Sequence, residues 1–207
     1  MTKRLLIIVS LYCLLSAAAA AGTILVLADS LSASYGIAIE DGWVALLQER
    51  LRLQGYNYQV INASISGDTT AGAAARLGPL LERERPDIAI IELGGNDGLR
   101  GLSIAEIREN LTQIIRQFKQ RSSRVLLLPM QIPPNYGEIY TSKLSGIYAD
   151  LAQEHGITLG RFILDNIVLE HPELMQDDGI HPKAEAQSMM LDNIWDDLQP
   201  LLTKPGQ

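Results

Sequence analysis

Short apolar runs alternate with longer amphipathic stretches along most of this chain. Five apolar runs predict strands at 23–27, 58–62, 88–93 and 125–129, with a weaker one at 157–159. Three other stretches have apolar residues at helical spacing, and each predicts a helix with one buried face. Their apolar residues are Trp43, Leu46, Leu47 and Leu51; Ile104, Ile107, Leu111, Ile114, Ile115 and Phe118; and Ala186, Met190, Ile194, Leu198 and Leu201. Strands that alternate with helices are typical of βα units around a mainly parallel sheet.

Each of the first three predicted strands runs into a polar loop. The loops are Asp29-Ser30, then 63–68, then 94–97. Open parallel sheets bind ligands beyond the carboxyl ends of their strands, so we expect these three loops to converge on one side of the molecule. A further irregular stretch at 130–137 contains two prolines, which favour a structured turn over a helix or a central strand.

The first 21 residues have the composition of a secretory signal peptide. Two basic residues precede an apolar run over 5–15, and a serine and five alanines follow. We expect cleavage after Ala21, which would leave 22–207 as a single domain that is periplasmic or secreted. A retained membrane anchor is the alternative, but residues 5–21 are at the short limit of the roughly 17 to 25 residues that a spanning helix needs.

The mature chain would be acidic and free of cysteine. The one cysteine, Cys13, and two of the 17 basic residues lie in the expected signal peptide, so 15 basic residues would face 24 acidic ones, a net charge of −9. Without cysteine there would be no disulfide, thiol nucleophile or zinc thiolate. An acidic surface argues against nucleic acid and anionic membranes as partners, and we expect a monomer that is not inserted in the membrane.

A serine directly after the first predicted strand and a histidine near the end of the chain offer candidate catalytic chemistry. Ser30, His181 and Asp178 would supply the nucleophile, base and orienting carboxylate that acyl transfer through a covalent intermediate requires. The three-residue spacing lets Asp178 reach the Nδ1 proton of His181, which leaves Nε2 free for the serine hydroxyl. Asp177 could compete for this role, but a peptide neighbour points its side chain elsewhere, so Asp178 is favoured.

Three groups could hold the oxyanion of a tetrahedral intermediate. They are the backbone N–H groups of Ser30 and Gly67 and the side-chain amide of Asn96. Gly67 has no Cβ, so a substrate carbonyl can approach its backbone closely, and Gly94 with Gly95 would form a tight turn that aims Asn96 inward. Loss of one such donor typically lowers the rate roughly 10²- to 10³-fold.

Four blocks of this sequence, in order, resemble those of the GDSL or SGNH hydrolase family, which centre on Ser, Gly, Asn and His. The blocks lie at 28–32, 60–69, 91–101 and 175–182, so the resemblance extends over nearly the whole mature chain. It implies an α/β fold, namely a flavodoxin-like three-layer αβα sandwich with a mainly parallel five-stranded sheet. It also implies Ser30 as nucleophile, His181 and Asp178 as the rest of the triad, and Gly67 and Asn96 in the oxyanion hole.

Two residues depart from the family pattern. The first block of the family opens with Gly, where this chain has Ala28, and relatives often carry Gly where this chain has Ser34. Either substitution has little effect if the backbone φ angle there is negative, but a positive φ or a close neighbour makes it unfavourable by about 1 kcal/mol. We expect activity to survive both.

The expected activity is hydrolysis of acyl esters and thioesters without a metal or organic cofactor. The resemblance implies aryl esters, lysophospholipids and acyl-CoA as substrates, although an acidic protein would not attract the anionic CoA. Leu99, Ile132 and Pro133 are candidates for binding an acyl chain. Arg100 could meet a phosphate or head group, but a solvated loop arginine is the commoner case. His155 and His171 lack a carboxylate at the spacing of His181 and are expected at the surface.

Three alternatives remain open at this point. One is an esterase of the same family that is specific for acetylated sugars. Another is a metal-dependent phosphoesterase, since Asp29, Asn96, Asp178 and His181 are all possible metal ligands. The last is a ligand-binding module without catalysis, which requires that Ala28 has spoiled the geometry of the nucleophile. No Gly-x-Ser-x-Gly motif occurs, which disfavours the α/β-hydrolase fold.

Overall fold

Five parallel strands form one sheet, in the order β2-β1-β3-β4-β5. A computed structural model describes residues 21–204, and its strands are β1 (Gly22–Ala28), β2 (Tyr58–Asn62), β3 (Ile88–Glu92), β4 (Arg124–Leu128) and β5 (Thr158–Leu159). Every predicted strand is present and begins and ends within one residue of its predicted bounds. Residues 1–20, nearly all of the expected signal peptide, lie outside the described residues.

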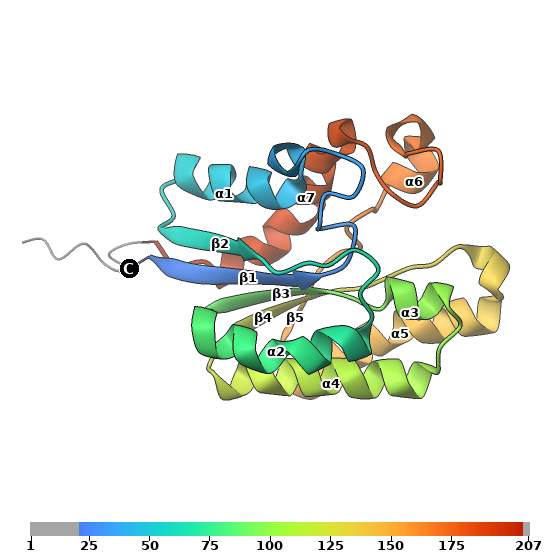
Figure 1. Cartoon of the computed structure of the whole chain (residues 1–207), viewed down its shortest axis with the longest axis horizontal. Helices are drawn as coiled ribbons and strands as arrows, with labels where there is room; N and C mark the ends of the chain where they lie inside the picture. Colours follow the sequence, from blue (N-terminus) through green and yellow to red (C-terminus); the bar gives the residue numbers. More distant parts are fainter. Residues whose placement is uncertain (1–20, 205–207) are drawn as a thin grey trace, which may run out of the picture.

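Helices cover both faces of the sheet and make three layers (Figure 1). One face carries α1 (Trp43–Leu53), α6 (Ile167–Glu170) and α7 (Gln187–Leu198). The other carries α2 (Thr70–Glu84), α3 (Gly95–Leu99), α4 (Ile104–Gln120) and α5 (Glu138–His155). Short 3₁₀ helices connect them: η1 (Ile39–Asp41), η2 (Pro134–Tyr136), η3 (Pro172–Leu174), η4 (Ala184–Ala186) and η5 (Gln199–Leu201). The three-layer αβα architecture expected from the sequence is confirmed.

The central strands β1 and β3 are buried on both faces, which explains why they read as continuous apolar runs. Most side chains of the three predicted helical stripes are buried as well, while Leu46, Ile104 and Leu201 are partly exposed against the same core. The third stripe extends beyond α7 into η4 and η5. The hydrophobic core therefore lies where the apolar pattern places it.

Two long helices, α2 and α5, and the short helices α3 and α6 were not predicted. The inward face of α2 begins with small residues such as Ala73, and the helix contains Pro79, so its periodicity is weak. In α5 the exposed Ile139 lies outside the buried face, which weakens the amphipathic pattern. At 94–97 we expected a tight turn, but only Gly94 is a left-handed turn residue, and Gly95 already begins α3. Pro134 is the first residue of η2, a position that proline tolerates.

The two departures from the family pattern differ in backbone geometry. Ala28 ends β1 in regular register with Glu92 and has no exposed surface, so its backbone is extended and an alanine fits without strain. Ser34 has φ of 57°, in the left-handed region that favours glycine. A side chain in place of the family glycine is therefore unfavourable for the backbone at Ser34 but not at Ala28.

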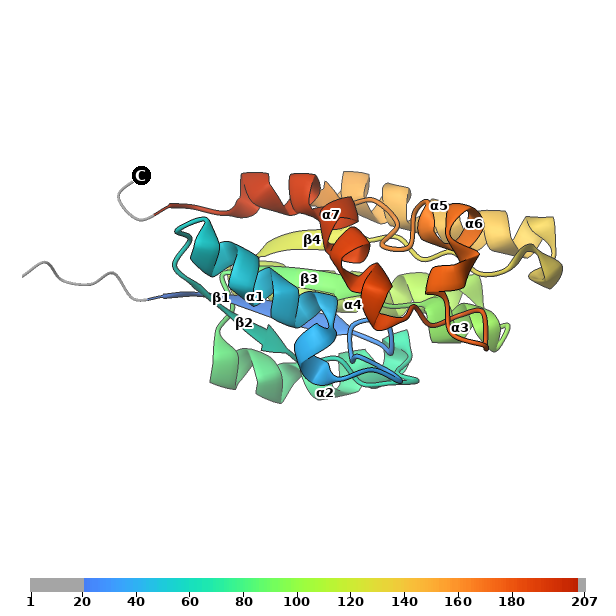
Figure 2. The same cartoon turned by 90° about the horizontal axis from the view of Figure 1, so that it is seen from above.

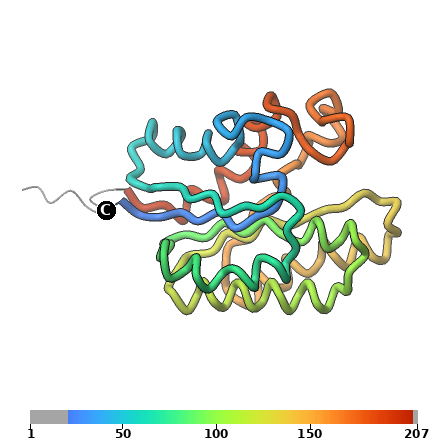
Figure 3. The backbone as a smooth tube through the Cα atoms, viewed as in Figure 1, coloured from blue at the N-terminus to red at the C-terminus, as the bar shows by residue number. Residues whose placement is uncertain are grey.

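The beginning and end of the described chain lie at the same end of the sheet, opposite the loops that follow β1, β2 and β3 (Figures 2 and 3). Tyr58, at the start of β2, pairs with Gly22, and its hydroxyl lies 2.9 Å from Oγ1 of Thr203. Gly22 therefore lies far from the carboxyl ends of the strands.

Candidate active site

The loops after β1, β2 and β3 converge at the carboxyl edge of the sheet, as the βα pattern predicts. The N–H of Ile65 donates to the carbonyl of Ala28 at 3.1 Å, which joins the second loop to the first. The Asn96 amide nitrogen donates to Oδ2 of Asp29 at 3.0 Å, which joins the third loop to the first. These contacts bring together loops that lie far apart in the sequence.

Ser30, His181 and Asp178 form one hydrogen-bonded row. Nε2 of His181 lies 2.8 Å from Oγ of Ser30, and Nδ1 lies 2.7 Å from Oδ2 of Asp178. Both distances are within the range that a nucleophile, its base and an orienting group require. The structure places Asp178 against the imidazole and leaves Asp177 exposed.

The carboxylate of Asp178 is held in place by its own loop. Its Oδ1 accepts the backbone N–H groups of Ile180 and His181, each at 2.9 Å. Partial burial alone would raise the pKa of Asp178, but hydrogen bonds from the His181 ring and from these backbone groups outweigh it and hold the pKa at about 2. Asp178 is therefore ionised at neutral pH and can stabilise an imidazolium.

Contacts around the His181 loop fix the direction of the ring. The N–H of Gln176 donates to the carbonyl of His181 at 2.7 Å, and Met175 forms an antiparallel bridge with Pro182. The ring of Tyr35 lies against the imidazole, with 4.3 Å between centroids. The sequence offered no signal for Tyr35, because this contact joins residues 35 and 181, which the tertiary fold brings together.

The candidate oxyanion residues have the backbone geometry that close approach needs. Gly67 has φ of +78°, and the Nη2 of Arg100, 3.9 Å away, is the nearest atom that a Cβ there would meet. Arg100 also donates to the carbonyl of Gly67 at 3.1 Å. Gly94 has φ of +111°, and a Cβ there would lie 2.3 Å from the Tyr148 hydroxyl, so only glycine fits this entry to α3 and Asn96.

Asp97 connects the loop that carries Asn96 to the loop that carries Gly67. Its carboxylate is buried and accepts the N–H and the hydroxyl of Thr70, at 2.9 and 2.6 Å. Thr70 is the first residue of α2, three positions after Gly67. The start of α2 and the start of α3 are thus held together by one carboxylate.

Two buried carboxyl groups lie beneath the row. Asp29 is 2% exposed, and its oxygens accept the N–H of Leu31 at 3.1 Å and the amide of Asn96 at 3.0 Å. Glu92 is fully buried. Burial raises the pKa of Asp29 to about 6, and burial together with the charge of Asp29 raises the pKa of Glu92 well above its usual value. Glu92 was not among the predicted site residues, and its only signal in the sequence is a glutamate inside an apolar run.

A cavity of about 570 Å³ opens in front of Ser30, within the size range of small-molecule sites. Leu99, Ile132 and Pro133 line it, as the sequence suggested, whereas Arg100 does not. Several further apolar residues that the sequence did not indicate also line it: Leu31, Met130, Phe162, Leu164, Val168, Leu169 and Ile180. The wall is mainly apolar, so the cavity suits an acyl chain.

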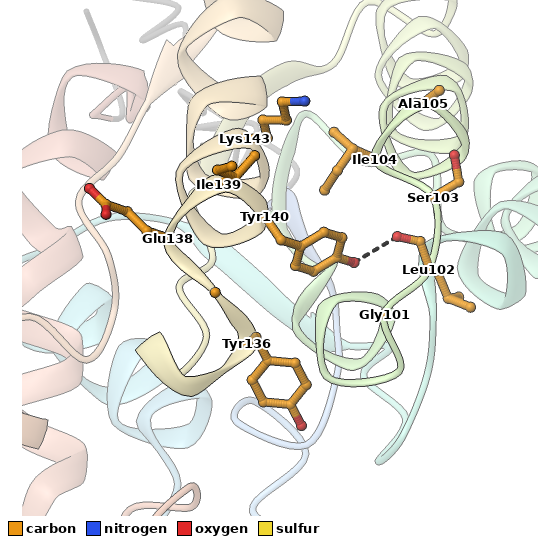
Figure 4. A pocket seen from close by; sticks show the side chains of 11 residues that line it. Gly101, Leu102, Ser103, Ile104, Ala105, Tyr136, Glu138, Ile139, Tyr140 and Lys143 are labelled. Carbon is orange, nitrogen blue, oxygen red and sulfur yellow. Dashed lines mark hydrogen bonds between the residues drawn. The ribbon is translucent and has the colours of Figure 1, made fainter.

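A second hollow, of about 830 Å³, lies between the start of α4 and the start of α5 (Figure 4). Most of its lining residues are exposed, and the Tyr140 hydroxyl donates to the Leu102 carbonyl across it at 2.6 Å. It contains no histidine, and none of the row Ser30, His181 and Asp178 lines it. The smaller cavity is therefore the candidate active site.

The surface expectation for His155 and His171 is wrong in part. The side chain of His155 is only 10% exposed, and its Nε2 has no hydrogen-bond partner among the described residues. Burial lowers the pKa of His155. His171 is partly exposed, but Nδ1 lies 3.3 Å from Oε1 of Glu173, so it does have a carboxylate partner. Neither histidine lines the cavity in front of Ser30.

Residues 21–204 contain neither a cluster of metal-ligating side chains nor a membrane-spanning helix. Within this range no three His, Cys, Asp or Glu side chains are grouped as a metal ion would require. Nor does any helix of this described part have the length and apolar character to cross a membrane.

A serine, a histidine and a carboxylate in hydrogen-bonded order, beyond the carboxyl ends of a parallel αβα sheet, define the class of hydrolases that act on acyl groups. Comparison with known proteins agrees with this class. Residues 29–188 match the GDSL-like Lipase/Acylhydrolase family, and the chain belongs to this family. The resemblance inferred from four sequence blocks is confirmed, and the protein is an enzyme that hydrolyses ester bonds.

Named relatives cover nearly the whole chain. It is 48% identical to "Esterase TesA" of Pseudomonas aeruginosa, over 91% of this chain and 94% of the relative. It is 42% identical to "Thioesterase 1/protease 1/lysophospholipase L1" of Escherichia coli K12, over 89% and 87% of the two chains. The crystal structure of the psychrotrophic esterase EstA from Pseudoalteromonas sp., inhibited by monoethylphosphonate, matches with a TM-score of 0.83 and 37% identity, over 86% of this chain and 97% of that one.

Proposed function

We propose that the protein hydrolyses acyl esters and thioesters through an acyl-enzyme on Ser30, with His181 as base and Asp178 as the orienting carboxylate. The observation that carries this proposal is the continuous row from Ser30 Oγ to His181 Nε2 and from His181 Nδ1 to Asp178, at 2.8 and 2.7 Å. The phosphonate-inhibited esterase with the same fold supports it, because phosphonates mimic the tetrahedral intermediate of acyl transfer.

The reaction runs in two halves. Ser30 Oγ attacks the carbonyl carbon while His181 Nε2 takes its proton, and Asp178 stabilises the resulting imidazolium. The N–H groups of Ser30 and Gly67 and the Asn96 amide stabilise the oxyanion. His181 then protonates the leaving alcohol or thiol. Water, activated by His181, hydrolyses the acyl-enzyme and restores Ser30. No metal or organic cofactor takes part in these steps.

The apolar cavity favours substrates with an acyl chain. Leu99, Ile132 and Pro133 would contact the chain, and an acetyl group would leave most of the 570 Å³ unfilled, which disfavours an esterase for acetylated sugars. Arg100 lies beside Gly67, outside the cavity, where a charged head group on the leaving alcohol would meet it.

The natural substrate in this proposal is a lysophospholipid or a free fatty ester. The named relatives include an esterase and a thioesterase/lysophospholipase. A mature chain with net charge −9 repels the anionic CoA thioesters. Specificity constants for palmitoyl-CoA, palmitoyl lysophospholipid and a palmitate ester test this choice, and a large preference for palmitoyl-CoA contradicts it.

The proposal also includes export of the protein and the bounds of its single domain. Residues 1–21 act as a cleavable signal peptide, and residues 22–207 form one domain that works as a monomer in the periplasm or outside the cell. Mass spectrometry of the N-terminus of the exported protein and its size in solution test these statements. A mature protein that begins elsewhere, or a stable dimer, contradicts them.

One experiment separates the proposed mechanism from a metal-dependent phosphoesterase. Hydrolysis of p-nitrophenyl esters from acetate to palmitate is followed for the wild type, Ser30→Ala and the exposed control Ser188→Ala, with and without chelator. We expect chelator-insensitive turnover that is lost only in Ser30→Ala. Turnover that survives in Ser30→Ala overturns the role of Ser30, and sensitivity to chelator moves the metal-dependent alternative to first place.

A further inference from the structure

Glu92 is a buried carboxyl group that the proposed mechanism does not use. It ends β3 in register with Ala28, the residue that precedes Asp29 and Ser30. Its side chain is fully buried and does not line the cavity. A fully buried glutamate is unfavourable unless each of its oxygens has a hydrogen-bond partner, so its surroundings show what it does.

The hydrogen bonds on one oxygen of Glu92 have a fixed direction. The Trp43 indole N–H donates to Oγ of Ser32 at 3.2 Å, because an indole nitrogen is a donor only. The Ser32 hydroxyl in turn donates its hydrogen to Oε2 of Glu92 at 2.9 Å. Oε2 is therefore an acceptor.

The other oxygen, Oε1, has no donor among the described residues. An ionised carboxylate would leave this oxygen without a hydrogen bond in a site that solvent does not reach, which is unfavourable for a charged group. A neutral carboxylic acid removes this problem, since its hydroxyl can donate to an acceptor.

Asp29 is the acceptor within reach. Its carboxyl is in hydrogen-bonding contact with that of Glu92 and accepts two N–H groups, from Leu31 and from Asn96. Two buried carboxyl groups in contact cannot both be ionised, so one proton lies between them. Glu92 is the more deeply buried of the two, and its Oε1 has no hydrogen-bond partner among the described residues, which places the proton on Glu92. The raised pKa of Glu92 agrees with this assignment.

We propose that Glu92 is a positioning residue, a neutral carboxylic acid that donates to Asp29 and thereby fixes the acceptor that orients the Asn96 amide. The connected groups run from Trp43 and Ser32 through Glu92 and Asp29 to Asn96. No proton moves along these connected groups during the reaction. The inference rests on the proposed role of Asn96 in stabilising the oxyanion.

Two substitutions at Glu92 test the proposal. In Glu92→Gln the amide keeps one acceptor for Ser32 and one donor for Asp29, so kcat should stay within a few-fold of the wild type. Glu92→Leu removes the donor and frees Asp29 and Asn96 to move. We expect kcat to fall by about 10- to 100-fold, less than the roughly 10²- to 10³-fold for losing an oxyanion donor itself, with KM nearly unchanged. The exposed Glu109→Gln is the matched control.

Infrared spectroscopy tests the protonation directly, without reference to activity. At about pH 8, well above the usual pKa of a carboxyl group, the wild type and Glu109→Gln should show the carbonyl band of a buried neutral carboxylic acid, and Glu92→Gln should lack it. A missing band in the wild type overturns the proposal even if Glu92→Leu does not fold.

The kinetic outcomes are equally decisive. Folded Leu and Gln variants with equal losses of kcat contradict a neutral donor, and a Leu variant with wild-type kcat removes the positioning role. Failure of the proposed function would show instead as activity in Ser30→Ala, so the two failures are distinguishable.

Discussion

Ser34 is a strained residue close to the nucleophile. Its φ of 57° is unfavourable for a residue with a Cβ by about 1 kcal/mol, and glycine does not have this strain. We expect Ser34→Gly to raise the free energy of unfolding by about 0.5–1 kcal/mol, which raises the melting temperature by about 1–4 °C for a domain of this size. Thermal unfolding of the variant checks this, and an unchanged or lower melting temperature contradicts it.

For Ala28, the other departure from the family pattern, we expect replacement by glycine to destabilise the protein. Ala28 lies in regular strand geometry with its methyl group fully buried, so glycine there loses packing and adds backbone freedom to the unfolded chain. Ala28→Gly should lower the free energy of unfolding by about 1 kcal/mol. Denaturant unfolding measures the change, with Ser34→Gly beside it. Two shifts of the same sign would show that the backbone angles do not control these positions.

Asp177 and Asp178 are adjacent residues of one chemical type, so each is a control for the other. Only Asp178 contacts His181, through Nδ1 at 2.7 Å. In a serine protease with a Ser-His-Asp triad, replacing the orienting aspartate by asparagine lowers kcat by about 10⁴-fold. The reason is that asparagine favours the wrong tautomer of the histidine. We expect a loss of about 10³- to 10⁴-fold for Asp178→Asn and a near wild-type kcat for Asp177→Asn. Equal rates for the two variants would contradict the assignment.

At the scale of elements, the entry to α3 depends on a glycine that no other residue can replace. Gly94 combines φ of +111° with a Tyr148 hydroxyl 2.3 Å from the position of a Cβ, whereas Gly101 has φ of +67° and open space around it. Gly101→Ala should therefore be unfavourable by about 1–2 kcal/mol of strain alone. Gly94→Ala should add about 1–3 kcal/mol of overpacking and displace Asn96.

A second substitution separates backbone strain from overpacking at Gly94. Tyr148→Phe removes the hydroxyl that a Cβ would meet, together with its 2.9 Å bond to the Leu93 carbonyl. In the Tyr148→Phe background, Gly94→Ala should cause a smaller loss of unfolding free energy than in the wild type. A double-mutant cycle by denaturant unfolding measures this coupling. Additive effects would mean that strain, and not the tyrosine, excludes a side chain here.

The strands β1, β3 and β4 could be predicted from the sequence because their apolar runs are mainly buried and bounded by polar loops. The strands β2 and β5 are more exposed, and β5, with two residues, gave the weakest signal. The helix α2 could not be predicted, since Ala73 and neighbouring small residues give little contrast between its faces. For α3, five residues that begin with Gly95 have no helical signal of their own, and the element depends on Asp97 binding the start of α2.

In the site, too, contacts between residues close in the sequence could be predicted, whereas contacts between distant residues could not. Asp178 and His181 meet through a turn of three residues, so spacing alone predicts their contact. Tyr35 meets His181 only through the tertiary fold, and the apolar cavity wall at 162–169 comes from a segment without catalytic motifs. Chemistry with a fixed spacing can be read from one sequence, while the shape of a cavity requires the folded chain.

At the scale of the whole molecule, buried carboxyl groups tie stability to pH. Glu92 and Asp29 have folded-state pKa values above their unfolded values, so the folded chain holds more protons than the unfolded one above about pH 4. Their contribution is fully present below the unfolded pKa and is lost as the pH rises through the folded pKa. Asp178, with a pKa of about 2, acts oppositely, and its contribution is lost as the pH falls toward 2.

Glu92→Gln isolates the larger of these effects, since the repulsion that comes with the net negative charge of the chain is nearly the same in variant and wild type. Each proton kept only in the folded state changes stability by up to about 1.4 kcal/mol per pH unit. Between about pH 5 and pH 8 the wild type should therefore lose stability more steeply than Glu92→Gln, and the variant should gain on it as the pH rises. Denaturant unfolding at several pH values measures both slopes, with Glu109→Gln expected to parallel the wild type. Parallel curves for Glu92→Gln and the wild type would mean that Glu92 ionises at its usual pH despite its burial.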